Sequence, residues 1–201
     1  MLDKSLPYYD ILMKADYSLA TSHPICGLPC GYRYKFYEEG DAQLWAALET
    51  SVNEFVSTSD ALMYFNQIFV PHTKELKKRM CFIIDDKQNA VATATAWFRK
   101  LDDVCVPLLH WVSVHPDMQG FGLGKAITIY ALHQFLTLSD SKPIYLHTQT
   151  WSATAVAMYG KLGFKVSNEV FFQLSTRKEA KAVLERVLSK EVIDCVYKDF
   201  E

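Results

Sequence analysis

The sequence lacks long hydrophobic runs, a basic excess, internal repeats and low-complexity tracts. No apolar stretch approaches the roughly 18 residues that a membrane-spanning helix needs. The opening MLDKSLPYYD has no basic segment followed by an apolar core, so we expect no signal peptide. The formal net charge of −2 is unlike the basic surface typical of nucleic-acid-binding proteins. We therefore expect neither a membrane nor a nucleic acid as partner.

Cysteine is also scarce, with five residues in a chain of 201. An odd, small number in a chain long enough to build a core predicts mostly reduced thiols and a cytoplasmic location. The length predicts one domain. We assign that domain to residues 31–201. Residues 1–30, rich in Pro, Tyr, Ser and Gly, are expected to form an N-terminal arm or extension.

A clear succession of strand and helix patterns is present. Strands are predicted at 32–39, 80–86, 90–98, 104–114, 144–150, 164–166 and 170–174. Helices are predicted at about 41–55 and 60–69, after Gly122, at 152–162 and at 176–191. The tail at 192–199 is expected to be a last strand or a docked extension, and a role in homodimerisation stays open. Three strands in succession before the glycine-rich segment argue against a doubly wound sheet.

The segment QGFGLG (119–124) lies between a predicted strand and a predicted helix. It fits neither the Walker phosphate loop nor the dinucleotide fingerprint, because both require glycine or Ser/Thr at positions that hold other residues. The remaining pattern joins Gln119, Gly122 and Gly124. Backbone N–H groups at such a turn and the positive end of the helix dipole favour a bound phosphate. A tight turn without a ligand is the alternative.

This pattern resembles the GNAT superfamily of acyl-CoA-dependent N-acyltransferases, whose [QR]-x-x-G-x-[GA] motif QGFGLG matches. Ala155, Tyr159 and KLGF (161–164) stand in the spacing of a second family motif, while Ser152 occupies a position where the family often has Asn. The resemblance covers about 31–174, with core motifs at 104–164. It implies an α/β (α+β) GNAT fold: a mixed, largely antiparallel twisted sheet of six to seven strands, flanked by helices and ending in a C-terminal helix.

The resemblance also implies the site residues. Backbone groups of the strand segment Val112, Ser113 and Val114 would bind the pantetheine arm of acetyl-CoA, and Tyr159 would face its sulfur. The amides that would hold the pyrophosphate belong to one loop and helix start: Gln119, Gly120, Phe121, Gly122, Leu123, Gly124 and Lys125. Ser152 is included as a further cofactor-binding residue. Acetyl-CoA is the expected co-substrate, and no metal is expected.

The chemistry needs an acid and a base. A tyrosine hydroxyl with a pKa of about 10 suits protonation of the CoA thiolate, so Tyr159 is the expected acid. His110 is the expected base, because period-2 alternation places it on the same face as Val112 unless a bulge intervenes. The alternative is a histidine packed in the strand. His147, on the strand at 144–150, is a weaker candidate. Glu49 and Glu54 on the helix at 41–55 could attract a cationic amine, and the alternative is that they belong to an ordinary solvated helix face.

Three function classes follow. The first is an N-acetyltransferase that transfers the acetyl group of acetyl-CoA to a primary amine of a small molecule. The second is a catalytically silent acyl-CoA-binding sensor or subunit. The third is a protein N-acyltransferase. His23, Cys26 and Cys30 are too few to predict a zinc site.

Overall fold

The computed structural model describes residues 2–101, 104–138, 142–171 and 174–200. The chain divides into two compact units. The first unit comprises residues 1–19, 99–108 and 141–201, and the second comprises residues 20–98 and 109–140. Strand β5 (Val104–Val114) contributes residues to both units.

The second unit contains the strand order β2-β3-β4-β5. β2 (Tyr32–Phe36) pairs antiparallel with β3 (Met80–Asp85), which pairs antiparallel with β4 (Ala90–Leu101). The turn of the β3–β4 hairpin is held by the backbone N–H of Asn89, which donates to the Asp85 carboxylate at 2.8 Å. This confirms the hairpin predicted over residues 80–98.

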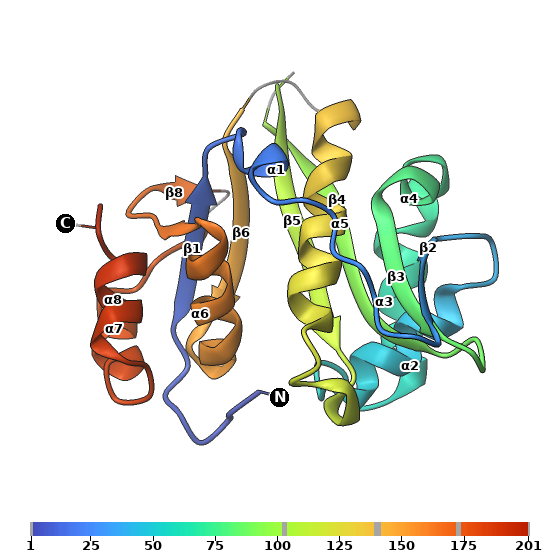
Figure 1. Cartoon of the computed structure of the whole chain (residues 1–201), viewed down its shortest axis with the longest axis horizontal. Coiled ribbons are helices and arrows are strands. Elements are labelled where there is room, and N and C mark those ends of the chain that lie inside the picture. Colours follow the sequence, from blue (N-terminus) through green and yellow to red (C-terminus); the bar gives the residue numbers. More distant parts are fainter. Residues whose placement is uncertain (1, 102–103, 139–141, 172–173, 201) are drawn as a thin grey trace. The chain divides into compact units, whose positions relative to one another are not determined.

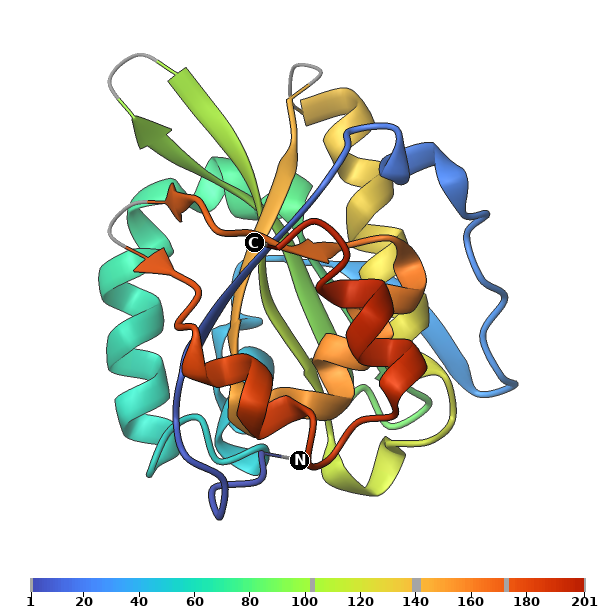
Figure 2. The ribbon, with the colours of Figure 1, turned by 90° about the vertical axis from the view of Figure 1, so that its left-hand side faces the viewer.

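Helices cover the strands of the second unit: α2 (Ala42–Ser51), α3 (Thr58–Ile68), α4 (Thr73–Arg79) and α5 (Leu123–Leu138). In Figure 2, α5 lies on one side of β4 and β5, and α3 lies on the other. The core of this unit is rich in fully buried aromatic rings, including Trp45, Phe65, Phe69 and Phe82. The helix following α2 begins after Ser57, whose hydroxyl caps the N–H of Asp60, and not after Ser59 or Asp60 as expected. Pro71 lies in a 3₁₀ turn, η1 (Val70–His72), that separates α3 from α4, as its rigid ring predicts.

The first unit contains the strand order β5-β6-β1-β7. β1 (Asp10–Ala15) pairs antiparallel with β6 (Ile144–Gln149) and with β7 (Lys165–Val166). The segment expected to be an arm therefore contains a strand of the sheet. Sequence reasoning missed it because Ile11, Leu12 and Met13 are consecutive and all buried, so no alternation marks them as a strand.

The rest of the first unit consists of short elements (Figure 1). They are α6 (Ala153–Leu162), β8 (Val170–Phe171), β9 (Leu174–Ser175), α7 (Glu179–Leu184) and α8 (Lys190–Val196). The single helix predicted over 176–191 was wrong: the chain leaves α7 before Ser189, whose extended backbone begins α8. The tail forms most of α8 and packs on α6. A short helix, α1 (Leu19–Ser22), follows β1.

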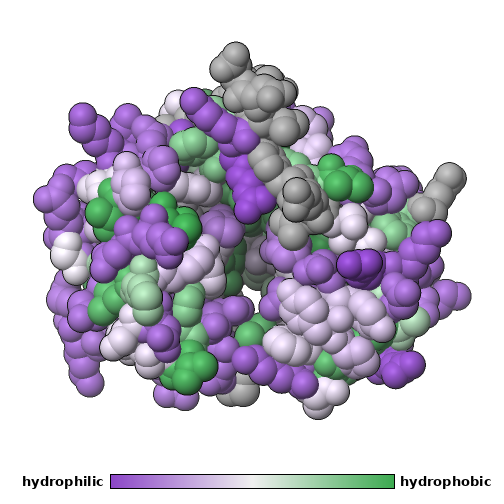
Figure 3. Space-filling model, turned by 180° about the vertical axis from the view of Figure 1, so that it is seen from behind, coloured by the Kyte–Doolittle hydropathy of each residue, from purple (hydrophilic) through white to green (hydrophobic). Residues whose placement is uncertain are grey.

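The sheet as a whole has seven strands, mostly antiparallel and flanked by helices, which confirms the predicted fold class. None of the helices in the described ranges combines the length and apolar character needed to cross a bilayer. Seen from behind, hydrophobic residues lie scattered among hydrophilic ones (Figure 3). Val56 and Met63 are among the exposed hydrophobic residues.

Candidate functional site

The glycine-rich segment forms a turn at the N-terminus of α5, in the second unit. A 3₁₀ turn, η2 (Pro116–Met118), leads from β5 into it. Gly120 and Gly122 have φ angles of +86° and +79°, in the left-handed region that favours glycine. The backbone N–H of Ala126 donates to Gly122 O at 3.0 Å, which begins the helix. The predicted turn between strand and helix is confirmed.

The turn has the features that a pyrophosphate group needs. A Cβ built on Gly120 or Gly122 would meet no atom within 4 Å, so the backbone borders open space there. The first four N–H groups of an α-helix have no partner inside the helix, and α5 is 16 residues long. Lys125 is exposed in the first turn, and the Phe121 side chain is 67% exposed. The residues present therefore fit an anionic group such as the pyrophosphate of coenzyme A.

The end of β5 leads directly into this turn. Val112, Ser113 and Val114 are all partly exposed residues. Gln119 Nε2 donates to Val114 O at 3.2 Å, and the backbone N–H of His115 donates to Val91 O at 2.9 Å. The glycine turn is thus tied to the last residues of the strand. Leu123, at the start of α5, is buried and anchors the helix in the unit.

β5 departs from regular strand geometry at Trp111. Its φ angle is +49°, in the left-handed region, which is uncommon for a bulky residue. His110 contacts the ring of Phe69, and Trp111 contacts the ring of Trp45, so two consecutive residues both reach the aromatic rings of α2 and α3. Regular alternation would point them to opposite faces. His110 and Trp111 therefore do not alternate as in a regular strand, and the role predicted for His110 stays a prediction.

Glu49 on α2 is the most unusual residue near β5. None of its surface is exposed (0%), and its Oε2 accepts a 2.8 Å hydrogen bond from the hydroxyl of Ser113. Within the described part of the chain, Oε1 is buried without any hydrogen-bond partner. Burial raises the pKa of Glu49 to about 8, against a smaller lowering by the Ser113 hydrogen bond, and Glu54 adds to the rise.

Glu49 does not lie on a solvated helix face, which was the alternative expected for it. The available signal was its position four residues after Trp45 and one after Leu48, on the apolar side of α2. A carboxyl group in such a stripe is forced into the core. Glu54, by contrast, lies beyond the end of the helix and is exposed.

Tyr159 lies on α6, in the first unit, and is 5% exposed. Its ring stands edge-on to Phe164 at 6.0 Å between ring centroids. Gly163, with φ of +115°, ends the helix as predicted, and the backbone N–H groups of Gly163 and Phe164 both donate to Tyr159 O. Burial raises the pKa of the Tyr159 hydroxyl well above its usual range, so the group stays protonated at neutral pH.

Ser152 precedes α6 and occupies its N-cap position. Its side chain caps no backbone N–H of the helix; instead, its hydroxyl accepts a hydrogen bond from Gln149 Nε2 at 3.3 Å. A 3₁₀ turn, η3 (Thr150–Ser152), joins β6 to the helix. Ser152 is only partly exposed.

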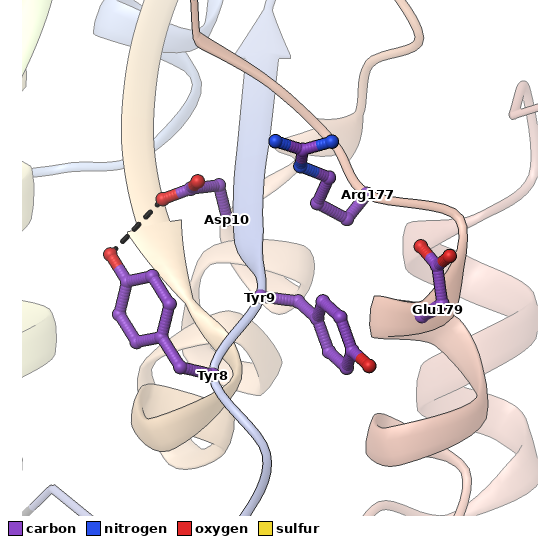
Figure 4. A pocket seen from close by; sticks show the side chains of 5 residues that line it. All are labelled: Tyr8, Tyr9, Asp10, Arg177 and Glu179. Atoms are coloured by element: carbon purple, nitrogen blue, oxygen red, sulfur yellow. Dashed lines mark hydrogen bonds between the residues drawn. The ribbon is translucent and has the colours of Figure 1, made fainter.

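A second polar cluster lies in the first unit, around the start of β1. His147 on β6 contacts the Asp10 carboxylate at 3.0 Å, and the Tyr8 hydroxyl donates to the same oxygen at 3.0 Å. An open pocket of about 310 Å³ lies here, lined by Tyr8, Tyr9, Asp10, Arg177 and Glu179. In the view of Figure 4, the Arg177 side chain lies between Asp10 and Glu179. His147 therefore has a carboxylate partner that sequence reasoning did not identify.

The cysteine-containing segment near the N-terminus shows no metal-binding geometry. No group of three or more potential metal-binding side chains occurs among the residues that the structure describes. The His23 carbonyl contacts the ring of His133 at 2.8 Å, and Cys26 O accepts a hydrogen bond from the Tyr34 hydroxyl at 2.9 Å. These contacts join the segment to β2 and α5 within the second unit.

Comparison with known proteins agrees with the fold and the glycine turn. The model of the acetyltransferase (GNAT) family matches residues 33–164. A mycothiol acetyltransferase of Kytococcus sedentarius is 31% identical over 83 residues, which are 41% of this chain and 27% of that protein. The chain thus spans well under half of that relative.

Solved structures show the same fold at low sequence identity. A GCN5-related N-acetyltransferase from Sphaerobacter thermophilus superposes with a TM-score of 0.61 and 15% identity, over 81% of this chain and 49% of that one. A tandem GNAT protein from the clavulanic acid biosynthesis pathway gives a TM-score of 0.61 and 14% identity, over 82% and 52%. Since the family model covers more than half of the chain, this protein belongs to the GNAT family of acetyltransferases.

Proposed function

We propose that this protein is an N-acetyltransferase that transfers the acetyl group of acetyl-CoA directly to a primary amine of a small molecule. One observation carries the proposal: the two left-handed glycines of QGFGLG border open space at the N-terminus of a 16-residue helix. That arrangement suits a pyrophosphate group, and in the GNAT family this group belongs to acetyl-CoA. Acetyl transfer is also named for the relative from Kytococcus sedentarius.

The binding roles are those that the family resemblance implies. Amides from Gln119 to Lys125 would hold the pyrophosphate, with the exposed Lys125 ammonium adding a positive charge. The backbone of Val112, Ser113 and Val114 would hydrogen-bond the pantetheine arm as an added strand does. Ser152 is proposed as a further contact to the cofactor.

Acetyl-CoA would supply a thioester carbonyl and a thiolate leaving group. The amine nitrogen attacks the carbonyl carbon, a C–N bond forms, and the C–S bond breaks. Tyr159 gives its hydroxyl proton to the departing sulfur and regains a proton from solvent. The backbone N–H of Val112 would polarise the carbonyl oxygen. The amine must also lose a proton, and His110 is the acceptor that sequence reasoning proposes.

The test is acetyl transfer by the purified chain. CoA release would be measured with acetyl-CoA and a panel of small primary amines, and the N-acetylated product would be identified by mass spectrometry. Turnover with at least one small amine is expected. Tight CoA binding in calorimetry without turnover on any amine would favour a silent acyl-CoA-binding module. Turnover on peptides alone would favour a protein N-acyltransferase.

A further inference from the structure

Glu49 on α2 and Ser113 on β5 form a hydrogen-bonded pair. Glu49 is fully buried, yet only Oε2 has a hydrogen-bond partner among the described residues. A buried carboxyl oxygen without a partner is costly, because its hydration is lost and nothing replaces it. The indole nitrogens of Trp45 and Trp111 are also buried without a partner in the described chain. These unsatisfied groups occur together between α2 and the distorted part of β5.

The distortion of β5 explains how Ser113 reaches Glu49. With this left-handed backbone, the Trp111 indole packs 5.1 Å from Trp45 on α2 and 5.6 Å from Phe55, which lies between α2 and α3, both measured between ring centroids. Ser113 lies two residues further along the strand, so alternation gives it the same side as Trp111. Its hydroxyl therefore points toward α2. Strain of this kind in a bulky residue persists only where the surrounding packing enforces it, and such positions cluster at functional sites.

Ser113 also lies on the surface that the proposed function assigns to the reaction. It stands between Val112 and Val114, and the residue is partly exposed. We propose that Ser113 and Glu49 form a proton relay that accepts the proton of the attacking amine; this inference rests on the proposed function. The amine N–H donates its proton to Ser113 Oγ while the Ser113 hydroxyl proton moves to Glu49 Oε2. Glu49 ends as the neutral acid and later returns a proton to solvent by the reverse path.

Ser113 is the catalytic residue of the relay, because it would touch the amine, whereas Glu49 acts through it. His110 is the competing acceptor. Its ring is packed against the rings of Phe69 and Trp111, at centroid distances of 6.4 and 5.6 Å. Ser113 already donates a 2.8 Å hydrogen bond to the Glu49 carboxyl group.

The charge environment suits a proton acceptor. Glu54, beyond the end of α2, is the charged group that acts on the Glu49 carboxyl. On the neighbouring elements, Tyr64 of α3 packs on Trp45 and Trp111, and His110 of β5 packs on Trp111. Burial is the largest cause of the raised Glu49 pKa, near 8, and Glu54 raises it further. A carboxylate with a raised pKa is a stronger base than an ordinary one. The acetylation rate is therefore expected to rise with pH through this range.

The experiment compares pH profiles of kcat/KM for acetylation of one accepted amine. Glu49→Gln keeps the size of the side chain but cannot take the proton, so kcat should fall about 100-fold and the rise near pH 8 should disappear. Ser113→Ala should show the same loss, and Ser113→Thr, which keeps a hydroxyl, should recover most of it. Glu39→Gln is the matched control, because Glu39 is an exposed carboxylate paired with Lys77. CoA affinity and thermal unfolding of each variant show whether it is folded.

The outcomes separate this inference from the proposed function. A wild-type chain that binds CoA but acetylates no amine overturns both. An active wild type whose rate and pH profile survive in Glu49→Gln overturns the relay alone. The rise of kcat/KM with pH could also disappear in His110→Ala and remain in Glu49→Gln. That result assigns the proton to His110 and overturns the relay.

Discussion

Gly160 on α6 faces Val196 on α8 so closely that a Cβ at Gly160 would lie 2.3 Å from Val196 Cγ1. Lys165 supports the same contact, since its Nζ donates to Cys195 O at 2.8 Å. α8 lies beyond the residues that the family model matches, whereas α6 carries Tyr159. The C-terminal helix therefore packs directly on the helix that holds the proposed acid.

Replacing Gly160 with Ala should push these helices apart. We expect Gly160→Ala to lower the free energy of unfolding by about 1–3 kcal/mol, as overpacked cores do. Urea denaturation measures the loss. Adding Val196→Ala removes the clashing methyl group and should recover part of the stability in a double-mutant cycle. Unchanged stability in Gly160→Ala would mean that α8 is not fixed on α6 as the structure shows.

Tyr159→Phe tests the proposed acid. The variant keeps the buried ring and its contact with Phe164, so the fold and the CoA affinity should hardly change. Without the hydroxyl, kcat should fall about 100-fold, while KM for acetyl-CoA should change much less. Because burial raises the pKa of Tyr159, no activity loss from its ionisation is expected at or below its ordinary pKa of about 10. An unchanged kcat would remove Tyr159 from the acid role.

Gly122→Ala tests the proposed pyrophosphate site. The added methyl group has open space, so its direct cost is backbone strain at φ of +79°, about 1–2 kcal/mol. If the turn holds CoA, the methyl group and the strained amides should weaken CoA binding about tenfold in calorimetry. Gly40→Ala is the matched control, with φ of +103° and open space but no place in the turn. Equal CoA affinity in both variants would contradict the site.

Glu49 should make stability depend on pH. Its pKa is raised to about 8 in the folded chain, against an ordinary value of 4.5, so the folded state binds more protons between these values. Stability from this group is therefore greatest below about pH 4.5 and falls as pH rises toward 8. Glu49→Gln should gain stability relative to wild type across this window, by up to about 5 kcal/mol at 1.36 kcal/mol per pKa unit.

Denaturation curves of wild type and Glu49→Gln at pH 5 and pH 8 measure this difference. The variant's advantage should be larger at pH 8. An equal advantage at both pH values would mean that the pKa of the Glu49 carboxyl group is not raised. Higher stability combined with lower activity in Glu49→Gln would identify a residue kept for function at the expense of stability.

The glycine turn and the helix end at Gly163 were readable from local patterns, because left-handed turns and helix caps depend on a few adjacent residues. The strand β1 was not, because a short buried run such as ILM lacks the alternation that marks a half-buried strand. The long helix expected over 176–191 was divided by packing near Ser189 that local spacing does not contain.

The sequence by itself determined the family pattern, most strands and helices, and the residues of the proposed cofactor turn, since these rest on spacing along the chain. Only the tertiary structure decided what surrounds each reactive side chain. It placed Glu49 in the core beside Ser113 and gave His147 the partner Asp10. It also distorted β5 at Trp111, next to His110, where the sequence pattern had assumed regular alternation. Burial and hydrogen bonds between residues distant in sequence set these properties, and no local pattern contains them.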